Sequence, residues 1–269
     1  MAFSRRSPRT RAFVIIAGGR GSRLEAVTRG EPKAGLEVYA GVSLLRLLVR
    51  KAQQVRLPVA IVAEEKWLPT LMCALGPFCH YPSLLADGGT GTAAALRVAA
   101  ADARAEEILV CNADTIVPAP LFQASAGIGT PSVATQLLTL RSVQNEGLVG
   151  VSDHGPGASV VHWGEGSNRA PQAPLLRCSS SGVYIFDTSF LRDRLRLGQS
   201  SLELELIPTL VNDGVLRAVV AEGMLPTFDF GVPHRFKALQ NSPQLVRHLL
   251  LQMGLISHRD TRRVQEVAA

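Results

Sequence analysis

The stretch AFVIIAGGRGSRL, residues 12–24, decides the fold. Its first part, Ala12–Ile16, is apolar and rich in β-branched side chains, which is typical of a buried strand. The glycines that follow it let the backbone approach a ligand closely and point N–H groups at phosphate oxygens. Their spacing differs from the GxGxxG of dinucleotide-binding folds and from the GxxxxGKS/T phosphate loop. We therefore predict a phosphate-binding turn of another type after the first strand.

Outward from this stretch, short apolar runs alternate with helical patterns. The predicted strands are Val59–Ala63, Leu84–Leu85 and Ile108–Asn112, and the predicted helices are Ser43–Gln54 and Thr92–Ala103. Strand–helix–strand units at this spacing build a mainly parallel sheet with helices on both faces. Ligands bind at the carboxyl ends of such strands, so the turns after Ile16 and Cys111 should face one cleft.

The second half of the chain reads as strands separated by turns. These strands are Val133–Leu140, Leu148–Val151, Val160–Trp163, Gly182–Phe186 and Leu216–Ala221. A capping box of Ser200 and Glu203 predicts a helix over Leu202–Val211, and Pro233 predicts the start of a helix running towards Leu250. We expect a single α/β domain over residues 12–253 with a doubly wound, mixed but mainly parallel, Rossmann-like sheet. Its halves are 12–125 and 126–253.

Charge and composition exclude several classes of protein. The net charge is +6, but residues 12–256 hold 21 basic and 20 acidic residues, so the excess lies at the chain ends. We therefore expect a basic flexible tail over 1–11, a C-terminal tail over 254–269, and no nucleic-acid partner. No apolar run approaches the ~18 residues of a membrane helix. Four cysteines without a CxxC pair fit a reducing, cytoplasmic location.

Two acidic residues and two basic residues suggest chemistry on phosphates. Asp114 directly follows an apolar strand, and Asp229 lies between two phenylalanines. Because Mg²⁺ prefers one or two carboxylates together with substrate phosphates, these aspartates suggest a shared metal site. Arg23 and Lys33 would add cations for a polyphosphate. The structural alternatives are a capping or turn role for Asp114, burial of Asp229, and surface cations beside a tight glycine turn.

Six segments, in order along the chain, resemble the signature motifs of the sugar-1-phosphate nucleotidylyltransferases. They are AGGRGSRL at Ala17–Leu24 with Lys33 in EPK, GTAAALR at Gly91–Arg97, LVCNADTI at Leu109–Ile116, SSGVYIFD at Ser180–Asp187, SLELELIP at Ser201–Pro208 and FDFGVPHRF at Phe228–Phe236. The compact size and the GTxxAL segment look most like the heptose-1-phosphate guanylyltransferase branch. That likeness favours GTP over dTTP, with UTP, CTP and ATP behind them.

The resemblance implies a reaction and a role for each matching residue. A sugar 1-phosphate would attack the α-phosphorus of an NTP and release pyrophosphate, without a nucleophilic Ser or Cys. Arg23, Lys33 and Asp114 would be catalytic, with Asp114 and Asp229 holding Mg²⁺. The remaining residues are the nucleotide-binding set Ala17, Gly18, Gly19, Gly21, Ser22, Asp87, Gly91 and Thr92, and the sugar-binding set Gly147, Glu165, Arg177 and Tyr184. Asp87 is either an acceptor for the N1 and N2 donors of guanine or a turn residue.

One position departs from the family pattern. Gly166 stands where the family has a lysine that contacts the sugar phosphate, and Arg169, Arg177 or His162 would have to replace its charge. The departure leaves the acceptor open among heptose, octose, hexose and cyclitol phosphates. It also keeps alternatives open: a thymidylyl- or other base-specific transferase, a cytidylyl- or molybdopterin nucleotidyltransferase of the same fold, or a silent nucleotide-sugar-binding regulatory subunit. The sequence leaves open whether the chain forms a homo-oligomer.

Overall fold

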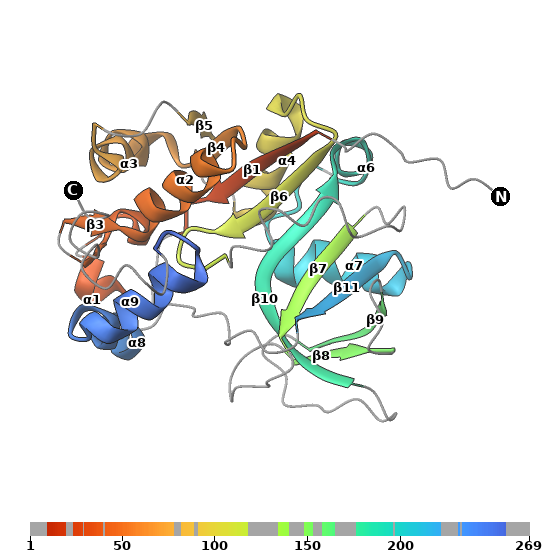
Figure 1. The fold of residues 1–269 in the computed structure, drawn as a ribbon. Coiled ribbons are helices and arrows are strands. Elements are labelled where there is room, and N and C mark those ends of the chain that lie inside the picture. The colour runs from red at the N-terminus through yellow and green to blue at the C-terminus, as the bar shows by residue number, and fades with distance from the viewer. Residues whose placement is uncertain are drawn as a thin grey trace.

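The computed structural model describes residues 10–19, 24–28, 30–39, 41–77, 82–88, 91–117, 134–139, 148–152, 158–164, 176–195, 197–221, 231 and 233–256. Within these residues one nine-stranded sheet runs through the molecule in the order β5-β4-β1-β6-β10-β7-β11-β9-β8 (Figure 1). The strands are β1 Arg11–Ile16, β4 Val59–Ala63, β5 Ser83–Ala86, β6 Glu107–Asn112, β7 Ala134–Thr139, β8 Leu148–Val151, β9 Ala158–Gly164, β10 Leu176–Asp187 and β11 Leu216–Ala221.

The sheet is mixed: the strands of the first half pair parallel with one another, whereas the second half contains both kinds of pairing. Parallel pairing joins β5, β4, β1 and β6, and it also joins β7 to β11. Strand β10 runs antiparallel to β6, β7 and β8, so it links the parallel first half to the strands of the second half. Strands β8 and β9 pair antiparallel at the far end of the sheet.

Helices cover both faces of the sheet because β1 is apolar on both sides. Phe13 and Ile15 pack into one buried cluster, while Val14 and Ile16 pack into the other. The helices on the first face are α2 Leu44–Gln54, α3 Leu68–Leu75, α8 Pro233–Gln240 and α9 Pro243–Gln252, and those on the second face are α4 Thr92–Asp102, α6 Thr188–Arg194 and α7 Ile207–Asn212. This arrangement confirms the predicted doubly wound α/β fold.

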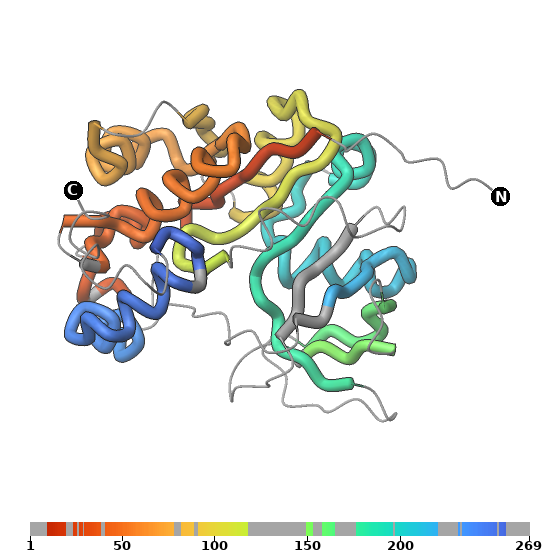
Figure 2. Tube along the Cα trace, viewed as in Figure 1, coloured from red at the N-terminus to blue at the C-terminus, as the bar shows by residue number. Residues whose placement is uncertain are grey.

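The last two described helices lie against the first part of the chain. Figure 2 traces α8 and α9, in blue, back from the second half to lie against the first helices and strands. The side-chain amide of Gln240 donates to the carbonyl oxygen of Glu37 at 3.0 Å, in the hairpin of β2 Glu37–Tyr39 and β3 Val42–Ser43. Lys51 of α2 donates to the carbonyl oxygen of Gly254 at 3.3 Å, and burial lowers the pKa of this lysine.

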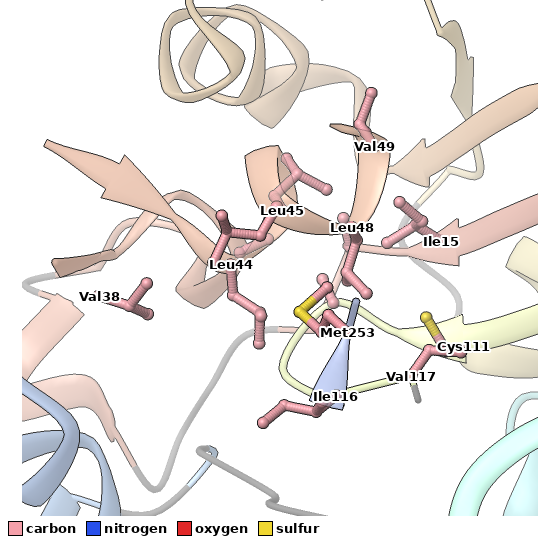
Figure 3. Close-up of a cluster of buried hydrophobic side chains, with 14 of the residues drawn as sticks. Ile15, Val38, Leu44, Leu45, Leu48, Val49, Cys111, Ile116, Val117 and Met253 are labelled. Carbon is pink, nitrogen blue, oxygen red and sulfur yellow. The ribbon is translucent and has the colours of Figure 1, made fainter. Parts of the chain in front are cut away.

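The turn after α9 packs behind the loop that follows β6. Figure 3 shows the side chain of Met253 beside Leu48, Ile116 and Val117, and all four belong to one buried cluster. Met253 is fully buried. The C-terminal turn is therefore part of the packing that supports the segment just after Asp114.

Several sequence predictions need correction at the level of elements. The expected helix from Pro233 towards Leu250 is two helices, because Ser242 caps α9 by accepting a hydrogen bond from the N–H of Leu245, and Pro243 begins the new helix. The cap expected at Ser200 is formed by Ser201, which accepts from the N–H of Leu204. The helix there begins as one π-helical turn, Leu202–Leu206, before α7.

The bounds expected for the two tails, 1–11 and 254–269, also need correction. Arg11 lies in β1, where it is buried and pairs with Glu107 at 2.8 Å. Leu255 and Ile256 are buried in the core rather than in a solvated tail. The packed region therefore includes Arg11 and extends to Ile256, whereas the division into halves at residue 125 stays a prediction. Among the residues that the structure describes, no helix is long and apolar enough to cross a membrane.

Candidate active site

Three loops predicted to bind the nucleotide meet at one edge of the sheet. The N–H of Ala17 donates to the carbonyl oxygen of Val62 at 2.8 Å, and the N–H of Ala113 donates to that of Ile16 at 3.0 Å. The N–H of Asp87 donates to the carbonyl oxygen of Ala63 at 3.1 Å. These bonds continue the parallel pairing beyond the strands. The carboxyl ends of β1, β4 and β6 therefore lie together, as the sequence predicted.

The glycine turn after β1 has Asp87 on one side and Lys33 on the other. A Cβ placed at Gly18 would lie 3.1 Å from Oδ2 of Asp87 and 3.4 Å from Cα of Ala63. A Cβ at Gly19 would lie 3.5 Å from Cε of Lys33. A side chain at Gly18 would push against Asp87 and the end of β4, so this close approach explains the need for glycine there.

A cation and a carboxylate converge over this turn. Nζ of Lys33 forms an ion pair with Oδ2 of Asp114, and the two side chains are only 20% and 11% exposed. Lys33 begins the short 3-10 helix Lys33–Gly35, whereas Asp114 follows the end of β6. The carboxylate of Asp114 thus faces the ammonium of Lys33, and a carboxylate is one of the ligands that Mg²⁺ prefers.

Neither of the two buried thiols in the described part of the chain, Cys111 and Cys178, is set up as a nucleophile. Burial raises the pKa of the Cys111 thiol well above its usual value, and the negative charge of Asp114 raises it further. Burial also raises the pKa of Cys178 to about 11. Both thiols stay protonated at neutral pH and pack as small apolar groups.

The start of α4 is held by the second half of the chain. Gly91 has a φ of +107°, and the N–H of Ala93 donates to the carbonyl oxygen of Ser200 at 3.1 Å. The hydroxyl of Thr92 donates to Oε2 of Glu203 at 3.3 Å and accepts from the N–H of Leu202 at 2.8 Å. The Thr92 side chain therefore joins α4 to the π-helical turn, and any contact with a nucleotide falls to the backbone.

Ser200 and Glu203 were predicted only as a capping pair, although they position this end of the site. The carbonyl oxygen of Glu203 also accepts from Nε1 of Trp163 at 2.9 Å, which ties the same turn to β9. The spacing of Ser200 and Glu203 signals a helix start, but nothing local signals the partner segment at Gly91.

Tyr184 lies in the core rather than on the surface of the described site. Its ring is 1% exposed and stacks on Phe186 at a centroid distance of 5.8 Å. The register of β10 pairs Tyr184 with Val110, which turns its side chain into the second buried cluster. A direct contact with the sugar, as predicted from the resemblance, is not available to the ring in this position.

Arg177 and His162 lie on the same side of the second-half strands. Both pair with Gly150, Arg177 from β10 and His162 from β9, and directly paired residues share a face of the sheet. Their neighbours Val149 and Val151 point the other way into the core. Arg177 is exposed, while Nε2 of His162 is buried and has no hydrogen-bond partner within the part of the chain that the structure describes.

The remaining predicted residues lie outside the described residues. They are Gly21, Ser22, Arg23, Gly147, Glu165 and Asp229, together with Gly166 and Arg169. Within the described ranges no group of three or more His, Cys, Asp or Glu side chains is arranged to hold a metal ion. Asp114 is the described member of the predicted pair of metal ligands.

Comparison with known proteins shows what this chain is similar to. Residues 13–128 match the family described as the MobA-like NTP transferase domain. A mannose-1-phosphate guanylyltransferase of Mycobacterium tuberculosis (strain ATCC 25618 / H37Rv) is 25% identical over 266 residues, covering 95% of this chain and 70% of that protein. The solved structure of the inositol-1-phosphate CTP transferase from T. maritima superposes with a TM-score of 0.71 at 14% identity, covering 91% of this chain and 96% of the other.

Proposed function

We propose that the chain is a sugar-1-phosphate nucleotidyltransferase, which transfers a guanylyl group from GTP to a sugar 1-phosphate in a Mg²⁺-dependent reaction. The products are a GDP-sugar and pyrophosphate. The observation that carries the proposal is the convergence of Lys33 and Asp114 over Gly19 at the carboxyl ends of β1 and β6. A displacement between two anions needs this combination of a close backbone, a cation and a metal ligand.

In the proposed reaction the protein positions two anions and neutralises their charge. An oxygen of the sugar phosphate attacks the α-phosphorus of the nucleotide, and the bond to pyrophosphate breaks on the opposite side. The glycine turn and Arg23 hold the triphosphate, and Lys33 leaves Asp114 to contact phosphate oxygens. Mg²⁺, held by Asp114 and Asp229, would neutralise developing charge when bound. No covalent intermediate on the protein is required.

Asp87 supports guanine as the base. Its carboxylate lies against Gly18 beside the glycine turn, and a carboxylate accepts hydrogen bonds from the N1 and N2 donors of guanine. Adenine lacks a donor pair of this kind, so Asp87 would discriminate against ATP. The similarity to a guanylyltransferase over 95% of the chain points the same way.

The sugar phosphate is proposed to bind on the face of the second-half strands that carries Arg177 and His162. Arg177, which is exposed, replaces the charge of the lysine that is absent at Gly166, and His162 lies on the same face. Gly147 and Glu165 contact the sugar. The acceptor stays open among heptose, octose, hexose and cyclitol phosphates. A cytoplasmic enzyme of this kind needs only NTP and sugar phosphate as partners.

The test crosses five nucleotides, GTP, dTTP, UTP, CTP and ATP, with hexose-, heptose-, octose- and cyclitol-1-phosphates and measures pyrophosphate release with Mg²⁺. We expect release with GTP and one class of acceptor. Asp114→Asn should abolish it, whereas Asp102→Asn, at an exposed carboxylate at the end of α4, should not. Asp87→Asn should lower kcat/KM for GTP more than for the other nucleotides.

Two outcomes would contradict the proposal. Equal release of pyrophosphate by Asp114→Asn and the wild type would show that Asp114 is not a metal ligand in the reaction. Binding of nucleotide without release for any acceptor would favour the nucleotide-sugar-binding regulatory subunit instead, which the glycine at position 166 keeps as the second candidate.

A further inference from the structure

We propose that Lys33 is the built-in counter-ion of Asp114 in the free protein, so that a divalent cation reaches Asp114 only after the nucleotide has drawn Lys33 away. This counter-ion role rests on the proposed function and adds an order of binding to it, with the nucleotide before the cation. Cation and nucleotide binding are coupled through the exchange of one lysine between two anionic partners, the carboxylate of Asp114 and the phosphates.

The first observation is the ion pair itself. Nζ of Lys33 and Oδ2 of Asp114 are in contact, although the residues lie 81 positions apart in the sequence. Both side chains are mostly shielded from water, at 20% and 11% exposure, so solvent and salt screen their attraction less than at an open surface. The pair is therefore a defined state of the site and not a transient surface contact.

The second observation is how the two groups are mounted. The backbone of Lys33 is fixed at the start of a 3-10 helix in which Ala34 is buried. Asp114 is held just after β6 by the hydrogen bond from the N–H of Ala113 to the carbonyl oxygen of Ile16 at 3.0 Å. The carboxylate is thus fixed on a short side chain, whereas the ammonium lies at the end of a flexible four-carbon stem. Lys33 can change partner without a change of fold.

The exchange follows from charge. A cation approaching Asp114 alone meets a carboxylate already neutralised by the ammonium, and it must also displace that like charge. A nucleoside triphosphate brings several negative charges to the glycine turn, where Cε of Lys33 lies close to Gly19. Lys33 can then pair with phosphate while Asp114 becomes free for the cation. Thermodynamic reciprocity requires that each ligand strengthens the binding of the other by the same factor.

The test measures binding of Mn²⁺ alone to the full chain, by electron paramagnetic resonance of the free ion, without any turnover. Lys33→Met should tighten Mn²⁺ binding about tenfold or more, since the competing ammonium is gone. Lys33→Arg keeps a cation and should bind Mn²⁺ as weakly as the wild type. Lys237→Met, at an exposed lysine of α8, is the matched control for loss of one positive charge and should change nothing.

A second arm adds a non-hydrolysable GTP analogue. In the wild type the analogue should tighten Mn²⁺ binding, and Lys33→Met should reduce that enhancement because the lysine no longer competes in the free protein. Thermal unfolding of each variant checks that the fold is retained. If wild type and Lys33→Met bind Mn²⁺ alone equally well, the counter-ion role is overturned.

The double variant Lys33→Met with Asp114→Asn separates this inference from the proposed function. It should lose the tight Mn²⁺ binding gained by Lys33→Met. If the double variant keeps that binding, the ion lies elsewhere, and both the counter-ion role and the assignment of Asp114 as a metal ligand fail. If it loses the binding but wild-type protein turns over no substrate, the proposed function fails while the counter-ion role stands.

Discussion

Gly91 connects the two halves of the molecule through a contact that admits no side chain. A Cβ at this position would overlap the carbonyl oxygen of Ser200 and lie 3.1 Å from its carbonyl carbon, and the φ of +107° disfavours any other residue. Gly91→Ala should therefore lower the free energy of unfolding by roughly 3 kcal/mol or more. Urea denaturation measures this. Gly88→Ala is the control, because Gly88 has a φ of +71° but open space around it, and it should cost only about 1–2 kcal/mol. Equal costs for the two variants would show that backbone strain alone, without the overlap with Ser200, accounts for the effect of Gly91→Ala.

Single residues also show how far sequence reasoning reaches. Lys33 and Asp114 follow from local chemistry, since a lysine after a glycine turn suggests phosphate binding and a carboxylate after an apolar strand suggests a Mg²⁺ ligand. The structure brings the two side chains into contact. Tyr184 shows the limit. Its place in SSGVYIFD suggests a ligand contact, but the register of β10 against β6 turns its ring into the core. Register is a property of strand pairing and is not written in the segment itself.

At the scale of elements, the turn after α9 supports the loop that carries Asp114. Met253 is fully buried against Ile116 and Val117 (Figure 3), so Met253→Ala should cost about 2–5 kcal/mol of unfolding free energy. Met72→Ala is the matched control because Met72 of α3 is 42% exposed, and it should cost less than about 0.5 kcal/mol. Calorimetry of both variants tests this. A small effect of Met253→Ala would mean that the C-terminal turn does not brace the loop.

Element prediction succeeded where the pattern was local and failed where a partner decided the outcome. The strand Val59–Ala63 was predicted with its observed bounds, because an apolar β-branched run after a proline needs no distant partner to be recognised. The hairpin β2–β3 was missed since its strands are only three and two residues long. The break between α8 and α9 was missed because the helical apolar pattern continues across Pro243. The break is made by Ser242, which caps the start of α9.

At the scale of the whole molecule, the fold places the nucleotide chemistry and the proposed acceptor face on different parts of one sheet. Asp87 and Asp114 lie at the carboxyl ends of the parallel strands, with Lys33 paired to Asp114, while Arg177 lies near the start of β10 and His162 lies in β9. Strand β10 spans both parts of the sheet, since it pairs with β6 and with β8. The contact between Gly91, before α4, and Ser200, before the π-helical turn, is a second connection between the two halves. The fold class could be predicted because the apolar pattern within each half signals the strands and helices of that half. The joining contacts could not, since they link segments about a hundred residues apart.

The most direct test of the central claim follows the α-phosphate of the nucleotide. GTP labelled with ³²P at the α-phosphate is incubated with Mg²⁺, the active sugar 1-phosphate and either wild-type protein or Asp114→Asn. We predict that the label enters a nucleotide sugar with release of unlabelled pyrophosphate, and that Asp114→Asn slows this transfer by roughly a hundredfold or more. Label recovered only as GMP or attached to the protein, or transfer at the wild-type rate by Asp114→Asn, would contradict the account.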